Sequence, residues 1–232
     1  MAADFGGSSC HTAHNVRSHR RRSRRKRVVN IGEDTAVFPL EYIHRSMPST
    51  DPRSIATGSL IGTLSWLIGY AITYLLVAPN LRDSPLNRII ETLDGAPATH
   101  ELVGWVFYNA HFVDVVLDIP ILGSQTTAYI GGDTGFTPAL YLVPVVLLLA
   151  GGALISRQQA ATDPTAGGFA GLTVGLGYLP LTVIGGLLFE ITVGGATGGP
   201  DLTAAIILAG VIYPAVCAGI GGVAWAVLEN TR

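Results

Sequence analysis

The chain has 232 residues, of which 49% are hydrophobic and only 13% are charged, and its formal net charge is −2. A soluble domain averages about 25% charged residues, so this composition excludes an ordinary soluble domain and indicates a protein that faces lipid. No CxxC, HExxH, P-loop or GxSxG pattern occurs. The two cysteines, Cys10 and Cys217, lie in a polar tail and in an apolar segment, so no disulfide framework is expected.

The first 46 residues differ in charge from everything that follows. They hold nine Lys or Arg and four Asp or Glu, whereas residues 47–232 hold five Arg and twelve acids. The block "HRRRSRRKR" has no apolar periodicity, so a disordered basic tail is expected over residues 1–46. Such a block binds anionic lipid or nucleic acid, and we do not expect nucleic acid here. An alternative is an over-extended gene start, because Met47 opens "MPSTDPRSIATGSL", which reads like a natural N-terminus.

Four long apolar segments follow, over residues 55–78, 137–156, 167–190 and 202–228. Each meets the threshold of roughly 18 apolar residues for a helix that spans a membrane. Only helices and closed barrels satisfy their backbone hydrogen bonds in lipid, and these continuous segments lack the alternation of barrel strands. The sequence therefore predicts an all-α integral membrane protein, with a bundle of four transmembrane helices within residues 47–232.

Lys and Arg predict the orientation of this bundle, because cytoplasmic loops carry an excess of them. The basic tail and Arg53 precede the first span, which places both termini in the cytoplasm of a multi-pass protein of the cell membrane. Residues 79–136 then form a long extracellular loop with two Arg and seven acids. Within it, "SPLNRIIETLDG" predicts a short amphipathic helix, with Ser84 as the N-cap, Pro85 at the first helical position and Gly95 as the stop.

A second amphipathic helix is expected in this loop over residues 101–118. At about 100° per residue, His111, Asp114 and Asp118 fall on one side of that helix. The opposite side holds Trp105, Phe112, Val113 and Val116. This pattern is typical of a helix that lies on a membrane with one face in water. The alternative is that residues 102–123 enter the membrane, where two buried Asp would be costly.

The same polar residues are weak candidates for a metal site. His111, Asp114 and Asp118 could bind a divalent cation, but one His and two acids without a second His favour a solvated or packed polar face. We expect no metal and no cofactor. Within the spans, Glu190, Tyr178 and Tyr213 are the candidates for a polar transport path.

Three stretches of the chain resemble a known family. "GWVFYNAHFVDV", followed by "ALYLVPVVLLLAGG" and "GLTVGLGYLPLTVIGGLLF", is similar to a family of haloarchaeal multi-pass membrane proteins of unknown function, loosely labelled transporter-like. The resemblance covers roughly residues 50–230 and is sharpest over Trp105–Phe112. It implies the membrane fold but no substrate and no catalytic residue.

Two functions follow from these observations. The leading hypothesis is a structural or accessory membrane component that is not an enzyme, because no nucleophile–base pair or metal constellation appears. Its partners would be the lipid bilayer and either further copies of the chain or another membrane protein. The alternative is a transporter of ions or small solutes that acts as an oligomer, since four spans are few for a lone carrier.

Overall fold

The computed structural model describes residues 51–120, 122–131 and 135–231. Within them, four helical segments are long and apolar enough to cross a membrane, which confirms the four predicted helices. The first is α1 (Pro52–Arg82) and the second joins η2 (Pro138–Tyr141) to α4 (Leu142–Gln158). The third joins α5 (Pro164–Leu172) to α6 (Gly175–Leu188). The fourth runs through α7 (Leu202–Ala204), the π-helical segments η3 (Ala205–Ile212) and η4 (Pro214–Ala218), and α8 (Gly219–Asn230). The expected tail, residues 1–46, lies outside the described residues.

Each of these segments begins at a side-chain cap. Asp51, Thr137, Asp163 and Asp201 accept hydrogen bonds from backbone N–H groups of the first turn. In the first three segments the next residue is proline, whose missing N–H costs nothing at that position. The caps therefore fix where each apolar segment becomes helical.

Glycines bring the long helices into direct backbone contact. A Cβ added at Gly62 would overlap the carbonyl oxygen of Val174, and one at Gly177 would overlap that of Ser59, so α1 and the third segment touch through their backbones. The same close approach occurs at Gly152, Gly167, Gly171, Gly221 and Gly222, where α4 and α5 meet the fourth segment. Because small residues let helix backbones approach in this way, the bundle is packed without space between these helices.

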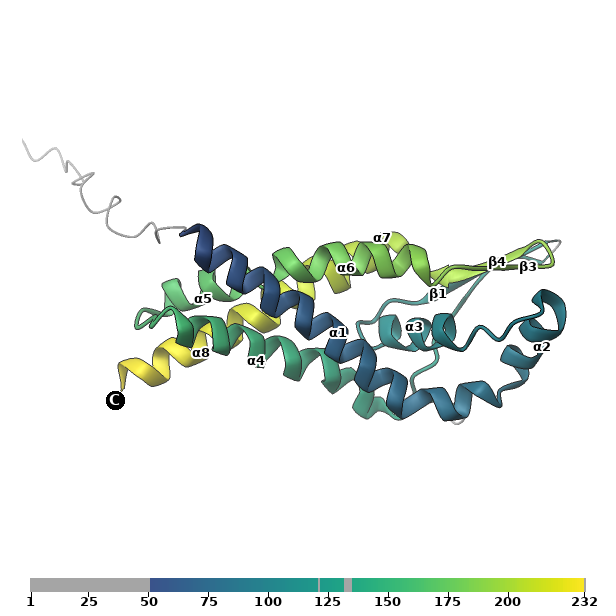
Figure 1. Ribbon diagram of the computed structural model, residues 1–232, viewed down its shortest axis with the longest axis horizontal. Coiled ribbons are helices and arrows are strands. Elements are labelled where there is room, and N and C mark those ends of the chain that lie inside the picture. The colour runs from purple at the N-terminus through teal and green to yellow at the C-terminus, as the bar shows by residue number, and fades with distance from the viewer. Residues whose placement is uncertain (1–50, 121, 132–134, 232) are drawn as a thin grey trace, which may run out of the picture. The chain divides into compact units, whose positions relative to one another are not determined.

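At one end of the bundle the chain forms two further helices and a sheet (Figure 1). The helices are α2 (Pro85–Asp94) and α3 (Thr99–Asn109). The sheet contains β1 (Val115–Ile119), β2 (Gly123–Thr127), β3 (Ile191–Val193) and β4 (Ala196–Pro200), in the order β2-β1-β4-β3 with all neighbours antiparallel. This sheet corrects the all-α expectation. It joins the connection after α3 to the hairpin between the third and fourth long segments.

The predicted helix over residues 101–118 is wrong beyond its first half. The helix α3 ends at Asn109, and residues 115–119 form the strand β1 instead. Nine of the eleven residues of α3 are buried, so α3 does not lie on a surface with one wet face. It packs against α1 and α6, inside the same end of the bundle that carries the sheet.

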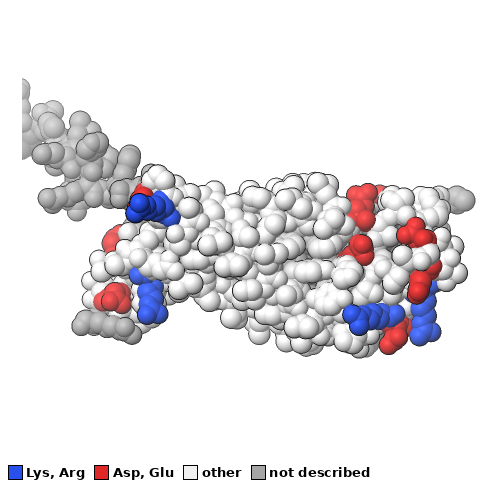
Figure 2. All heavy atoms as spheres, in the orientation of Figure 1, with Lys and Arg blue, Asp and Glu red and all other residues white. Residues whose placement is uncertain are grey.

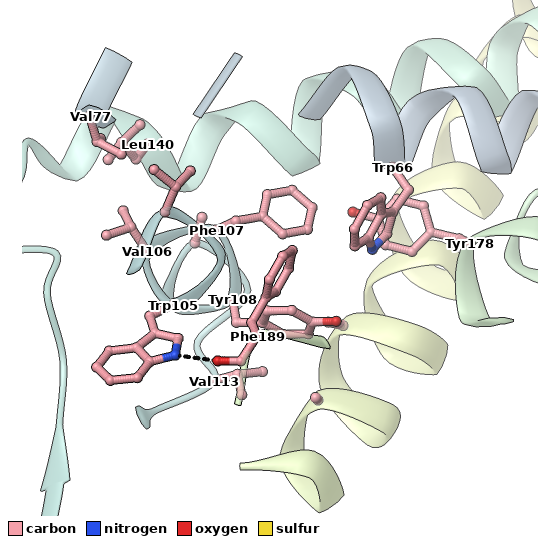
Figure 3. Packing of buried hydrophobic residues seen from close by; sticks show 14 of the residues in the cluster. Trp66, Val77, Trp105, Val106, Phe107, Tyr108, Val113, Leu140, Tyr178 and Phe189 are labelled. Atoms are coloured by element: carbon pink, nitrogen blue, oxygen red, sulfur yellow. Dashed lines mark hydrogen bonds between the residues drawn. The ribbon is translucent and has the colours of Figure 1, made fainter. Parts of the chain in front are cut away.

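Aromatic side chains hold α3 in that place. The rings of Phe107 and Trp66 meet edge to face with centroids 5.2 Å apart, and Phe189 stacks on Tyr70 of α1 at 5.3 Å. Figure 3 shows Phe107, Tyr108 and Phe189 filling the space between α3 and the neighbouring helices. Such aromatic pairs contribute about 0.5–1.5 kcal/mol each beyond the burial of their area.

Candidate functional site

The candidate site lies at the inner tip of α3, where the chain reverses direction and leads into β1. Two backbone N–H groups, those of His111 and Val113, donate to the carbonyl of Tyr108 and close the turn. The amide of Asn109 donates to the carbonyl of Val113 and accepts from the backbone N–H of Tyr129, which fastens the outgoing chain to the turn. Residue Phe112 adopts φ 58°, a left-handed conformation that is uncommon outside glycine. The reversal therefore depends on the Asn109 side chain and on one strained residue.

His111 sits in this turn with its side chain fully buried. Its Nδ1 lies 2.8 Å from the carbonyl oxygen of Phe107, and its Nε2 lies 2.7 Å from the hydroxyl oxygen of Tyr178 on α6. A carbonyl oxygen only accepts, so Nδ1 carries the proton and donates to Phe107. In the neutral imidazole Nε2 then accepts, and the Tyr178 hydroxyl donates to it. Both ring nitrogens are satisfied only in this tautomer.

The surroundings of His111 favour its neutral form. Burial lowers the pKa of His111 to about 4, and its hydrogen bond to the carbonyl of Phe107 opposes that shift only in part. The ring is enclosed by aromatic groups, with Phe107 at 4.9 Å, Tyr213 at 5.1 Å and Tyr178 at 5.9 Å between centroids. A neutral His that accepts from a Tyr hydroxyl can either anchor α3 or take up the proton of that hydroxyl.

Further hydrogen bonds join α3 to α6 and to Phe189, the residue after α6. The Tyr108 hydroxyl donates to the carbonyl of Thr182, and the Thr182 hydroxyl donates to the carbonyl of Tyr178. The indole N–H of Trp105 donates to the carbonyl of Phe189 at 2.8 Å (Figure 3). The bonds of Trp105 and Tyr108 lie one turn apart on α3, and the His111–Tyr178 pair follows just beyond its end, so this side of α3 is fixed to the third long segment.

The structure separates the three residues that the sequence placed on one polar stripe. Asp114 is exposed at the start of the strand, and its carbonyl accepts from the N–H of Asp201. Asp118 is exposed within β1, while His111 is buried. Across the described parts of the chain, no three His, Cys, Asp or Glu side chains lie close enough to hold a metal ion. The stripe is lost because α3 ends before His111 and the strand that follows has a different periodicity.

Two of the three residues considered for a transport path meet at the site. Tyr178 donates to His111, and the Tyr213 hydroxyl lies 3.5 Å from the carbonyl oxygen of Ala110. Glu190 is exposed and lies with Asp118 beside a hollow of about 140 Å³ on one face of the sheet. Glu190 thus lies beside the sheet, while Tyr178 and Tyr213 lie at the turn that holds His111.

Sequence reasoning missed two residues whose side chains hold the site together. Tyr108 and Asn109 had no assigned role, although both belong to the segment "WVFYNAHF", where the family resemblance is sharpest. Polar and aromatic residues concentrated in one short apolar segment were the available signal, because such residues need buried partners.

Comparison with known proteins places the chain in a family. No curated protein matches the chain, and no solved structure does. One family model matches residues 43–229, which include every helix and strand described above apart from the last residue of α8. The chain belongs to that family, a family of unknown function (DUF7978).

Proposed function

We propose that this protein is a structural or accessory component of the cell membrane and not an enzyme. The supporting observation is the packing of its bundle, in which glycines on facing helices bring backbones into contact. A carrier needs an aqueous path that opens alternately to the two sides, whereas these contacts leave no space between the helices they join. The His111 cluster then acts as the anchor that fixes α3, and with it the sheet, to the bundle.

The proposed partner is a further copy of the chain or another membrane protein. Large apolar side chains are exposed along the spans, among them Leu75 at 75% and Leu188 at 68%, so this surface is available to lipid or to another protein. Affinity purification in a mild detergent, followed by chemical cross-linking, tests this directly. We expect a stoichiometric second copy or a defined partner, and recovery of the chain alone as a monomer would contradict the proposal.

We also propose that both termini are cytoplasmic and that residues 79–136 face outward. Charged side chains gather at the two ends of the bundle and leave a broad uncharged band between them (Figure 2). The end that carries the sheet is rich in acids, and the opposite end follows the basic tail, in agreement with the preference of Lys and Arg for the cytoplasm.

Cysteine labelling tests this orientation. In a background with Cys10 and Cys217 replaced by serine, a cysteine introduced by Asp94→Cys should react with an impermeant maleimide on intact cells. One introduced by Gln158→Cys should react only after the membrane is opened. Labelling in the opposite order would reverse the proposed topology.

Transport is a second candidate, supported by two observations. The His111–Tyr178 pair is a titratable couple buried where α3 meets α6, and π-helical segments lie on both sides of Tyr213. Such segments occur frequently at functional sites. In sealed vesicles with an internal pH dye, a transporter would carry protons and lose that activity in the His111→Gln variant. If the protein is a structural component, vesicles with either the wild type or the variant should show the same dye signal as empty vesicles.

A further inference from the structure

An apolar groove lies between α2 and the sheet, apart from the His111 site. Its volume is about 270 Å³. It is lined by Leu86, Ile89, Ile90, Leu93, Trp105, Leu117, Ile119, Ile191, Val193, Ala196, Thr197 and Gly198. Threonine is the only polar residue among them and none is charged, so the groove offers nothing to a polar ligand.

The alternation of side chains along the strands creates this surface. Leu117 and Ile119 of β1 face the groove, while Val116 and Asp118 of the same strand line the polar hollow on the other face of the sheet. Across from them, α2 presents its own apolar side, with Ile89 57% exposed and Leu93 66% exposed. The amphipathic helix predicted from the sequence thus turns its apolar side toward the sheet and leaves part of that side uncovered.

Trp105 contributes only carbon atoms to the groove. Its single N–H is already donated to the carbonyl of Phe189, at 2.8 Å. The ring lies close to β4, where a Cβ added at Gly198 would come within 2.9 Å of the indole carbon Cη2. Water in such a place would lack the two to four polar partners that hold a buried water.

The size of the groove selects a narrow occupant. Pockets for whole drug-sized ligands begin at about 300 Å³. The groove is smaller than that, and its apolar lining suits a single hydrocarbon chain.

The proposed lipid-facing surface of α6 lies next to the groove. The last turn of α6 exposes Leu187 and Leu188 on the proposed lipid-facing surface, and Ile191 of the groove follows three residues later. We propose that this groove binds the hydrocarbon chain of a membrane lipid from the leaflet beside the sheet. The inference rests on the proposed membrane location, but it does not depend on whether the protein is structural or a transporter.

Photo-cross-linking tests the proposal at three positions on one helix. The full-length protein, with p-benzoylphenylalanine in place of Ile89, Leu93 or Glu91, is incorporated into nanodiscs of phosphatidylcholine and phosphatidylglycerol and irradiated. Glu91 is the control, because it is exposed on the same helix but does not line the groove. We expect a lipid adduct, identified by its mass, at Ile89 and Leu93 in several-fold excess over Glu91. Equal adducts at all three positions, or a cross-link to a second copy of the chain, would overturn the proposal.

A groove-filling variant provides an independent arm. Ala196→Phe adds a ring within the groove and should abolish most of the adduct at Leu93. Thr192→Phe adds the same ring to an exposed position on the neighbouring strand outside the groove and should leave the adduct unchanged. Loss of the adduct in both variants, or in neither, would contradict a chain-binding groove. If the membrane location itself is wrong, the protein will not enter nanodiscs, which is a different outcome from entry without the adduct.

Discussion

Removing the hydroxyl of Tyr178 isolates the hydrogen bond on which the candidate site depends. Tyr178→Phe keeps the ring, which is 1% exposed, but leaves Nε2 of His111 fully buried without a donor. A buried polar atom left without its partner costs about 1–3 kcal/mol, the desolvation penalty of that group. We therefore expect the free energy of unfolding to fall by about 1–3 kcal/mol.

Reversible unfolding in mixed micelles, followed by tryptophan fluorescence, measures this change. Tyr213→Phe is the matched control, since it removes a hydroxyl that is only part-buried and lies 3.5 Å from its acceptor. That variant should cost about 0.5 kcal/mol or less, as for ordinary surface changes. The reasoning fails if Tyr178→Phe is no more destabilising than Tyr213→Phe.

A double-mutant cycle then separates the bond from the packing around it. His111→Leu leaves the Tyr178 hydroxyl and the Phe107 carbonyl without partners, whereas the double variant with Tyr178→Phe leaves only the carbonyl. The double variant should therefore be more stable than the sum of the single changes predicts, by about 0.5–3 kcal/mol for residues in contact. Strict additivity would show that the two side chains do not interact.

Three further results are expected. Gly177→Ala should destabilise the bundle by about 1–3 kcal/mol or prevent folding, because its Cβ would overlap a backbone carbonyl. Gly219→Ala is the control and should be tolerated, and thermal melts in detergent measure both variants. The folded-state pKa of His111 lies below its unfolded value of about 6.5, so the free energy of unfolding is highest above pH 6.5. As the pH falls toward 4, it should decrease by up to about 3 kcal/mol. Unfolding measured against pH in His111→Gln should lack this decrease. Trp105→Phe should cost about 1 kcal/mol in the same unfolding assay, because the carbonyl of Phe189 loses its donor, and an unchanged stability would contradict that bond.

The sequence was sufficient where local chemistry decides the structure. The α2 helix begins at Ser84, whose side chain accepts from the N–H of Asn87, and it ends at Gly95 with φ 82°, as the cap pattern predicted. The four apolar segments were also predictable, because their length and hydropathy alone require a helix in lipid. Neither inference needs information about a distant part of the chain.

The sequence was insufficient where distant segments decide. Residues 101–118 were assigned to one helix because their polar residues fit a helical period, but the chain reverses after Asn109 and continues as a strand. The β-branched run "VVLDI" favours a strand, yet its partner β4 lies some 80 residues later in the sequence. His111 was expected to be exposed for the same reason, since its partner Tyr178 is brought to it only by the fold.

The order in which the helices can assemble during synthesis follows from the way α3 is held. Trp105 and Tyr108 of α3, and His111 just after it, bind to partners 84, 74 and 67 residues further along the sequence. At a translation rate of about 5–20 residues per second, these partners emerge roughly 3–17 s after α3 does. During that interval α3 can pack on α1, but its indole and hydroxyl groups and the imidazole of His111 lack their partners, so α3 is fully held only after Phe189 has been made. A ribosome-bound chain that ends before α6 should therefore leave α3 open to proteases, and one that extends past β4 should protect it.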